Sequence, residues 1–111
     1  MGFSLFLLLV CPKGFTLPTS SDYSSLTTTY SITNNSTGST KLRQSPLAFV
    51  YTGYYRYDTG SLNDEGSIGY CWSRTTYSGS FAYGLTFGSS GVYPQNNRDR
   101  GNGFALRCVG R

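Results

Sequence analysis

The chain has 111 residues, enough for one domain with a single modest core. It is rich in Tyr, Phe, Gly, Ser and Thr, and only 13% of its residues are charged, which excludes a disordered chain and favours short strands and turns. The nine basic residues give a net charge of +4, but they are scattered and form no run that could follow a phosphate backbone, so nucleic acid is not an expected partner.

The chain begins with an apolar run from Phe3 to Val10. The run is too short to span a bilayer, so no membrane insertion by this domain is expected. It also lacks the basic start and the small-residue cleavage site of a secretory signal. We therefore divide the chain into residues 1–10, which form either a buried strand or the remnant of a longer upstream segment, and one domain over residues 11–111.

A helix of about ten residues is predicted to begin at Ser20. Thr19 can accept a hydrogen bond from a free N–H group of the first turn. Asp22, three residues later, suits a capping box and the positive end of the helix dipole. An apolar stripe at i, i+3 and i+7 then starts at Tyr23.

The middle of the chain combines a polar segment with an aromatic one. TNNSTGST, residues 33–40, has no apolar anchor and is predicted to be an exposed loop. It contains overlapping glycosylation sequons at Asn34 and Asn35, which matter only in a host that glycosylates exported proteins. LAFVYTGYYRY, residues 47–57, is predicted to form a core strand or a bent pair of short strands around Gly53.

The second half of the chain is predicted to be a meander of short antiparallel strands. A turn-rich stretch leads to YCWSRTT, which carries the only Trp, and FAYGLTF then alternates around Gly84. VYPQNNRDRGNG is predicted to be a loop leading to FALRCV, which again has period 2. With the helix, these strands make the domain α+β and loop-rich, with one or two helices.

Residues that could carry catalysis are few. The sequence has no His, and the adjacent Asp64 and Glu65 point apart on a strand, so they are no acid–base pair. Cys71 has no His to activate its thiol, so we interpret it as structural or left over. No Cys/His zinc set, calcium loop or phosphate loop is present. We expect a protein that is not an enzyme and needs no metal or other cofactor.

Residues suited to adaptable recognition gather near the C-terminus. Tyr offers a large contact area with few torsions to fix, while Asn and Ser supply hydrogen bonds. The candidate ligand-binding set consists of Tyr93, Asn96, Asn97, Arg98, Asp99 and Arg100. The alternative is that such residues only pack a sheet with one wet face, and the sequence leaves both interpretations open.

The cysteines leave the cellular compartment open. Cys11, Cys71 and Cys108 are an odd number, so at most one disulfide can form within the chain. One disulfide with a leftover thiol is typical of an exported protein, whereas three buried thiols are typical of a cytosolic one. The count alone favours neither.

Three ordered blocks cover the chain from about Cys11 to Val109. They are CPKGFTLPTSSDYSSL, FVYTGYYRYDTGSLNDEGSIGYCWSRT and FAYGLTFGSSGVYPQNNRDRGNGFALRCV. The blocks resemble the opening CPxGWxLPTxxEWxxL, the centre and the ending of the Fibrobacter succinogenes major paralogous domain, or FISUMP. Phe15 and Cys71 stand where that family has Trp.

The resemblance implies a C-type-lectin-like α+β fold in which the chain ends meet. The first and last strands then pair, and FALRCV, from Phe104 to Val109, is the closing strand. Cys11 and Cys108 become neighbours, which implies a disulfide between them and leaves Cys71 free. The calcium motifs of C-type lectins, EPN or QPD and WND, are absent.

The resemblance also implies an exported or cell-surface bacterial module whose ligand-facing loops include the segment from Tyr93 to Asn102. We therefore expect a non-catalytic binding or adhesion module that recognises a carbohydrate or a protein. The alternatives are a purely structural surface domain, a degenerate relative of an enzyme, and a variable ligand-binding protein diversified by a retroelement. The sequence indicates no particular oligomeric state.

Overall fold

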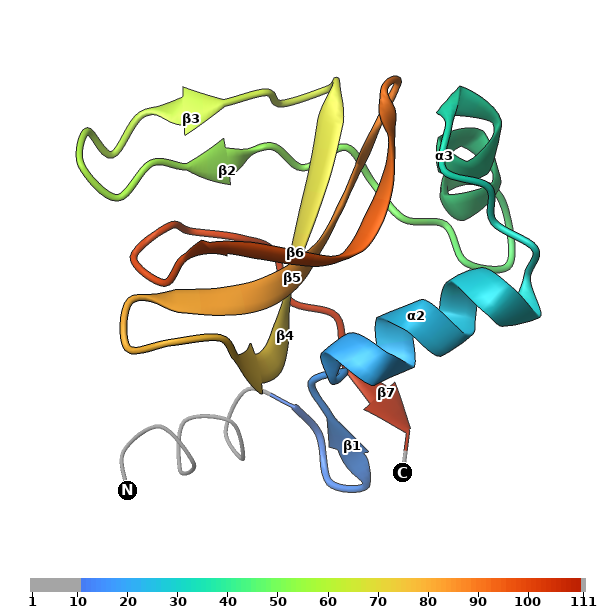
Figure 1. Ribbon diagram of the computed structural model, residues 1–111, viewed down its shortest axis with the longest axis horizontal. Helices are drawn as coiled ribbons and strands as arrows, with labels where there is room; N and C mark the ends of the chain where they lie inside the picture. The colour runs from blue at the N-terminus through green and yellow to red at the C-terminus, as the bar shows by residue number, and fades with distance from the viewer. Residues whose placement is uncertain (1–10, 111) are drawn as a thin grey trace.

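The computed structural model describes residues 11–110, so the expectation for residues 1–10 lies outside the described residues. The described chain is α+β and loop-rich, with two helices and antiparallel strands arranged in three small sheets (Figure 1). No helix in this part of the chain is long and apolar enough to cross a bilayer.

The central sheet contains three antiparallel strands in the order β4 (Ile68–Thr76), β5 (Phe81–Gly88) and β6 (Gly91–Asp99). The predictions of β4 and β5 are confirmed. The prediction of a loop in place of β6 is wrong, because the tight turn after Gly88 returns the chain along β5. β6 is an edge strand, where a residue such as Pro94 that cannot donate a hydrogen bond is tolerated.

Helix α2 (Ser20–Thr29) begins where the sequence predicts. The Asp22 N–H donates to the Thr19 hydroxyl at 3.1 Å, and the Thr19 N–H donates to the Asp22 carboxylate at 2.9 Å, which completes the capping box. Tyr23 is buried, and its hydroxyl donates to the Trp72 carbonyl of β4 at 3.1 Å. The helix is thereby fixed against the central sheet.

A second helix, α3 (Ser36–Arg43), replaces the predicted exposed loop. The Asn35 side chain caps it by accepting the Gly38 N–H at 3.1 Å. Leu42 is fully buried in the core, and Ser39 beside it is also fully buried. The prediction was wrong because one apolar side chain and one cap are enough to hold two helical turns against a sheet.

The segment 47–57 was predicted to be a core strand or a bent pair of short strands around Gly53. The structure shows the bend at Gly53 with one short strand after it and no strand before it. The ladder pairing of the segment is limited to β2 (Tyr54–Tyr55), which pairs with β3 (Leu62–Asn63) in a separate hairpin. Gly53 bends the chain with a φ of +64°, and a Cβ there would overlap the Asn63 carbonyl oxygen. The bend is the reason why this segment leaves the core after its first residues.

The core lies between the two helices and one face of the central sheet (Figure 1). Its buried residues are Tyr23, Leu42, Leu47, Phe49, Cys71, Leu85, Phe87 and Val92. Phe87 is fully buried and meets the Phe49 ring edge-on at 5.8 Å and the Tyr51 ring at 5.6 Å. Gly69 makes room for it, since a Cβ there would overlap the Phe87 ring.

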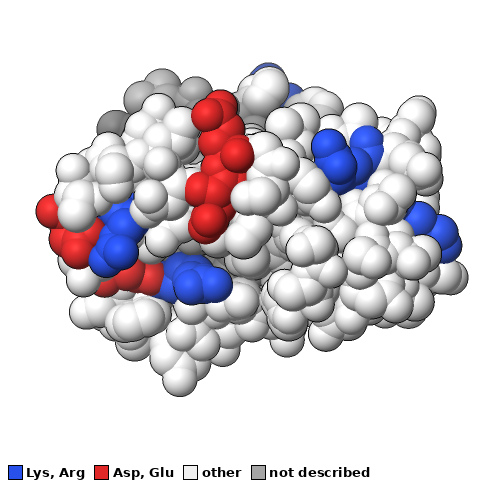
Figure 2. Space-filling view, turned by 90° about the horizontal axis from the view of Figure 1, so that it is seen from above, with Lys and Arg blue, Asp and Glu red and all other residues white. Residues whose placement is uncertain are grey.

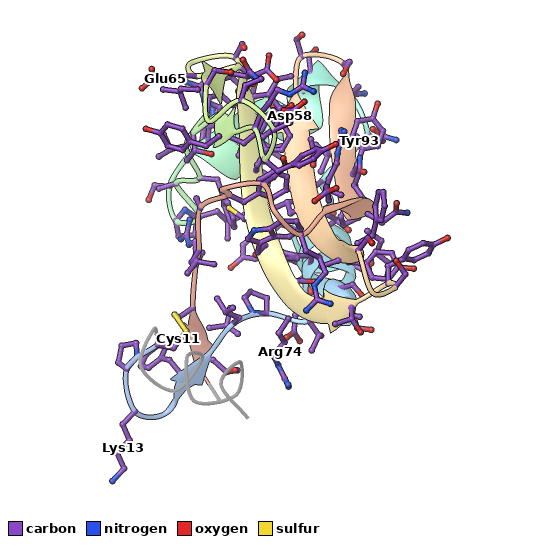
Figure 3. The ribbon with its side chains drawn as sticks, turned by 90° about the vertical axis from the view of Figure 1, so that its left-hand side faces the viewer. Cys11, Lys13, Asp58, Glu65, Arg74 and Tyr93 are labelled. Carbon is purple, nitrogen blue, oxygen red and sulfur yellow. A yellow bond between two sulfur atoms is a disulfide. The ribbon has the colours of Figure 1, made fainter. Side chains whose placement is uncertain are left out.

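The two ends of the described chain are joined, as expected. β1 (Phe15–Thr16) pairs with β7 (Val109–Gly110), and a disulfide connects Cys11 and Cys108, whose Cα atoms lie 5.8 Å apart (Figure 3). Cys71 is free and buried. The predicted disulfide and the pairing of the first and last strands are both confirmed.

The closing strand is shorter than predicted, because most of FALRCV lies outside β7. Ala105 makes only an isolated bridge to Cys71. Phe104 instead turns toward the central sheet and stacks on Trp72, with ring centroids 4.1 Å apart. The free energy gained when this ring packs on Trp72 outweighs the free energy that further strand pairing would contribute.

Removing the disulfide with the pair Cys11→Ser and Cys108→Ser is expected to lower the free energy of unfolding by about 4 to 5 kcal/mol. The physical reason is the long loop that the bridge closes, with a sequence separation of 97. Urea denaturation measures the loss, and wild-type protein reduced with a phosphine should match the variant. A loss below about 1 kcal/mol would contradict this role.

Candidate functional site

The outer face of the central sheet, opposite the face that packs on the helices, carries most of the polar residues that could bind a ligand. Side chains that stand opposite each other on paired strands share a face. Thr86 stands between Tyr70 and Tyr93, and Gly84 stands between Trp72 and Asn96. We use the name outer-face site for the buried Thr86 together with the accessible Tyr93, Asn96 and Arg98 on this face.

A bulge in β6 places Tyr93 and Asn96 on the same face. Tyr93 pairs with Thr86 and Asn96 with Gly84, so β6 has one more residue than β5 between these pairs. In a regular strand, residues three apart would point to opposite faces. The extra residue lies in the stretch with Pro94, where an edge strand accommodates both a bulge and a missing N–H.

The register divides the six predicted ligand residues into two groups. Tyr93, Asn96 and Arg98 belong to the outer-face site, since Arg98 pairs with Ala82, two residues before Gly84. The structure therefore brings three of the six together, but on a strand and not on the predicted loop.

The other three predicted residues lie elsewhere. Asn97 and Asp99 fall on the alternate positions of β6, opposite Tyr83 and Phe81, and so point to the other face. Arg100 lies in the turn after β6, where its guanidinium donates to the Gly79 carbonyl at 3.2 Å. These three side chains do not join the outer-face site.

Thr86 lies at one end of the site, opposite Tyr93, and is 6% exposed. Its Oγ1 has no hydrogen-bond partner among the residues that the structure describes. A buried hydroxyl without a partner costs on the order of 1–3 kcal/mol, and folded proteins contain few such groups. Sequence reasoning missed this residue, because a Thr in an alternating strand gives no signal that its hydroxyl lacks a partner.

The Tyr93 ring lies back along β6 over Gly91. A Cβ at Gly91 would lie 2.9 Å from the Tyr93 Oη and 3.0 Å from its Cζ, so only glycine leaves room for the ring in this position. Tyr93 keeps 38% of its surface exposed. It lies on the upper part of the sheet, away from the disulfide-linked end with Cys11 and Lys13 (Figure 3).

Tyr70 and Asp64 border the site on the β4 side. The Tyr70 hydroxyl donates to the Asp64 Oδ2 at 2.9 Å. Burial raises the pKa of Tyr70 above its usual value, Asp64 raises it further, and the charge of Arg98 lowers it. The charge of Arg98 acts on Tyr70 from a distance, because Arg98 stands opposite Ala82 and Tyr70 stands opposite Thr86, four residues further along β5. Within residues 11–110 the structure shows no ion pair for Arg98.

An aromatic cluster covers the β4 half of the outer face. Phe104 stacks on Trp72 and also meets the Tyr70 ring at 4.9 Å and the Tyr54 ring at 5.7 Å. The Trp72 Nε1 donates to the Asn102 carbonyl at 3.3 Å. Gly84 and Thr86 of β5 are buried as well, so the accessible part of the outer face lies on β6, at Tyr93, Asn96 and Arg98. Sequence reasoning assigned Phe104 to the closing strand and so missed this cover.

Charged side chains are distributed unevenly over the surface. Seen from above, both signs gather toward the end with the β2–β3 hairpin, whereas the charged side chains in view over α3 are basic (Figure 2). Arg56 and Asp58 form an exposed ion pair at 2.9 Å on the hairpin. In α3, Lys41 and Arg43 lie in the last turn, where they suit the helix dipole.

Cys71 lies on the core side of β4 and is 5% exposed. Burial raises the pKa of its thiol to about 11, and the nearby Arg107 lowers it. No group of three or more His, Cys, Asp or Glu residues in the described part of the chain could hold a metal ion.

The outer-face site offers an aromatic ring, hydrogen-bonding groups and a cation.

Comparison with protein-family models, with curated proteins and with solved structures found no match for this chain.

Thr86→Val is expected to leave the free energy of unfolding unchanged or to raise it by up to about 1 kcal/mol, because it removes an unpartnered hydroxyl with little change of shape. Thr86→Ser keeps the hydroxyl and is expected to cost about 1 kcal/mol through the lost methyl group. Urea denaturation of both variants measures the two effects. A Val variant less stable than the Ser variant would show that the hydroxyl is satisfied in the free protein.

The Cys71 thiol is expected to resist alkylation in the native state at pH 8. Its pKa of about 11 leaves only about one thiol in a thousand ionised at that pH, and burial blocks access to it. Mass spectrometry after iodoacetamide treatment measures the modification, with urea-unfolded protein as the control. Rapid alkylation of Cys71 in the folded protein would contradict this prediction.

Proposed function

We propose that this domain is a non-catalytic binding module that recognises a carbohydrate or a protein through the outer-face site. The observation that carries the proposal is that Tyr93, Asn96 and Arg98 share the outer side of β6 and stay accessible there. Beside them, the Thr86 hydroxyl stands between two tyrosines and has no partner within the described residues. Its oxygen is buried, so the ligand contacts are assigned to the three β6 side chains and not to Thr86.

The side chains around Thr86 complement one another chemically. Tyr93 contributes an exposed aromatic surface at low entropic cost. Asn96 can donate and accept hydrogen bonds, and Arg98 offers several donors in a planar arrangement. This combination suits binding. The thiol of Cys71 is buried and stays protonated, so Cys71 is a poor nucleophile, which agrees with a non-catalytic role.

We further propose a C-type-lectin-like fold related to FISUMP, on an exported protein. The joined chain ends support the fold, since β1 pairs with β7 and Cys11 bonds to Cys108. The disulfide is compatible with an oxidising compartment outside the cytosol. The ligand-binding residues in this proposal are Tyr93, Asn96 and Arg98.

Two double variants with matched chemistry test the proposed site. Asn96→Ala with Arg98→Ala removes polar groups from the outer face, whereas Asn97→Ala with Arg100→Ala removes the same groups from positions beside it. On glycan and peptide arrays, the first variant is expected to lose binding at least about tenfold and the second to bind as the wild type does.

Thermal denaturation serves as the control, because substitutions of exposed polar residues should change the melting temperature of either variant little. Equal binding by the wild type and by both variants would place the ligand elsewhere. No binding by wild-type protein on either array would favour a purely structural surface domain.

A further inference from the structure

We propose that the ligand of the outer-face site is an extended peptide with a single acidic residue, which adds as a strand along the lower half of β6. This inference rests on the proposed function and names the class of ligand. Three features carry it: the open edge of β6, the cation of Arg98 and the position of Asn96.

The upper half of the β6 edge is closed, and the lower half is open. The Val92 N–H points outward and donates to the Asn34 side chain at 2.8 Å, so the connection between α2 and α3 covers this part. At the other end, the Arg100 N–H points inward to the Ser80 carbonyl at 2.9 Å. Because N–H directions alternate along an antiparallel strand, the backbone groups of Asn97 point outward.

Asn97 is exposed, and by this alternation its N–H and C=O lie on the side of β6 that faces away from β5. An outward N–H and C=O on an edge strand are the groups with which an added strand pairs. The bulge and Pro94 limit such pairing to the stretch after them. On the other side of Asn97, the Asp99 carbonyl already accepts the Asn102 N–H at 3.1 Å. The added peptide is therefore short, and its pairing is centred on Asn97.

Arg98 selects the charge of the peptide. It is exposed, it points to the outer face and it has no ion pair within the described residues. A guanidinium matches a carboxylate through two parallel hydrogen bonds. The outer-face site contains one such cation, so one acid among uncharged residues fits best.

Asn96 selects for an amide-rich ligand. The Asn96 side chain is half-buried and, among the described residues, has no hydrogen bond that would occupy its amide. A carboxamide presents a donor and an acceptor side by side, which matches a peptide group or an Asn or Gln side chain. Tyr93 offers an apolar surface to a neighbouring side chain.

The test uses two pools of end-capped heptapeptides that differ at one central position. The first pool has Asp or Glu there and the second has Asn or Gln, while the other positions are uncharged. Fluorescence anisotropy with the oxidised full chain is expected to show at least about tenfold tighter binding of the acidic pool. Arg98→Ala should abolish this preference, and Arg100→Ala should preserve it.

N-methylation of alternate peptide bonds tests the strand pairing itself. Peptides methylated on the bonds that face Asn97 are expected to bind at least about tenfold more weakly, and those methylated one residue along should bind as the parent does. An equal loss of affinity in both sets of methylated peptides would show that the peptide does not pair with β6 as a strand. An acidic preference that survives Arg98→Ala, or binding of neither pool, would overturn the proposed ligand class.

The outcomes also separate this inference from the proposed function. If glycans bind with the same dependence on Asn96 and Arg98 while both peptide pools fail, the outer face is a binding site and the peptide assignment is wrong. If the double variant at Asn97 and Arg100 loses as much binding affinity as the double variant at Asn96 and Arg98, both proposals fail together.

Discussion

Burial of Phe87 decides which face of the central sheet lies inside. Its ring lies fully buried among the helices and meets Phe49 and Tyr51, and a glycine at position 69 leaves the space that it fills. Since strand residues alternate between faces, this one contact sends the neighbouring Thr86 outward. The polar groups of the outer face thus owe their position to an aromatic ring in the core.

The outer face is asymmetric for a similar reason. Phe104 stacks on Trp72 and takes up the β4 half of the face, so the residues there are bound to one another. On β6, by contrast, Tyr93, Asn96 and Arg98 stay accessible, and beside them the buried Thr86 hydroxyl lacks a partner among the described residues. Tight packing on one side and an unsatisfied group on the other are consistent with a rigid support beside an adaptable contact surface.

Local signals predicted the elements that depend on local interactions. The capping box of Thr19 and Asp22 placed α2 to the residue, and alternation located β4 and β5. α3 could not be recognised, because its stability comes from tertiary burial of Leu42 and not from an apolar stripe. Neither the β6 bulge nor the unpartnered Thr86 hydroxyl leaves a pattern in the sequence, since both arise from pairing with another strand.

The contact between the helical layer and the top of β6 has an evolutionary consequence. The Asn34 Oδ1 accepts a hydrogen bond from the Val92 N–H. The same oxygen would overlap a Cβ atom added at Gly91. The same Cβ would meet the Tyr93 ring. A change at position 91 therefore disturbs both a backbone cap and an aromatic surface. In a set of homologues, positions 34, 91 and 93 should accordingly vary together, while the neighbouring turn residues drift independently.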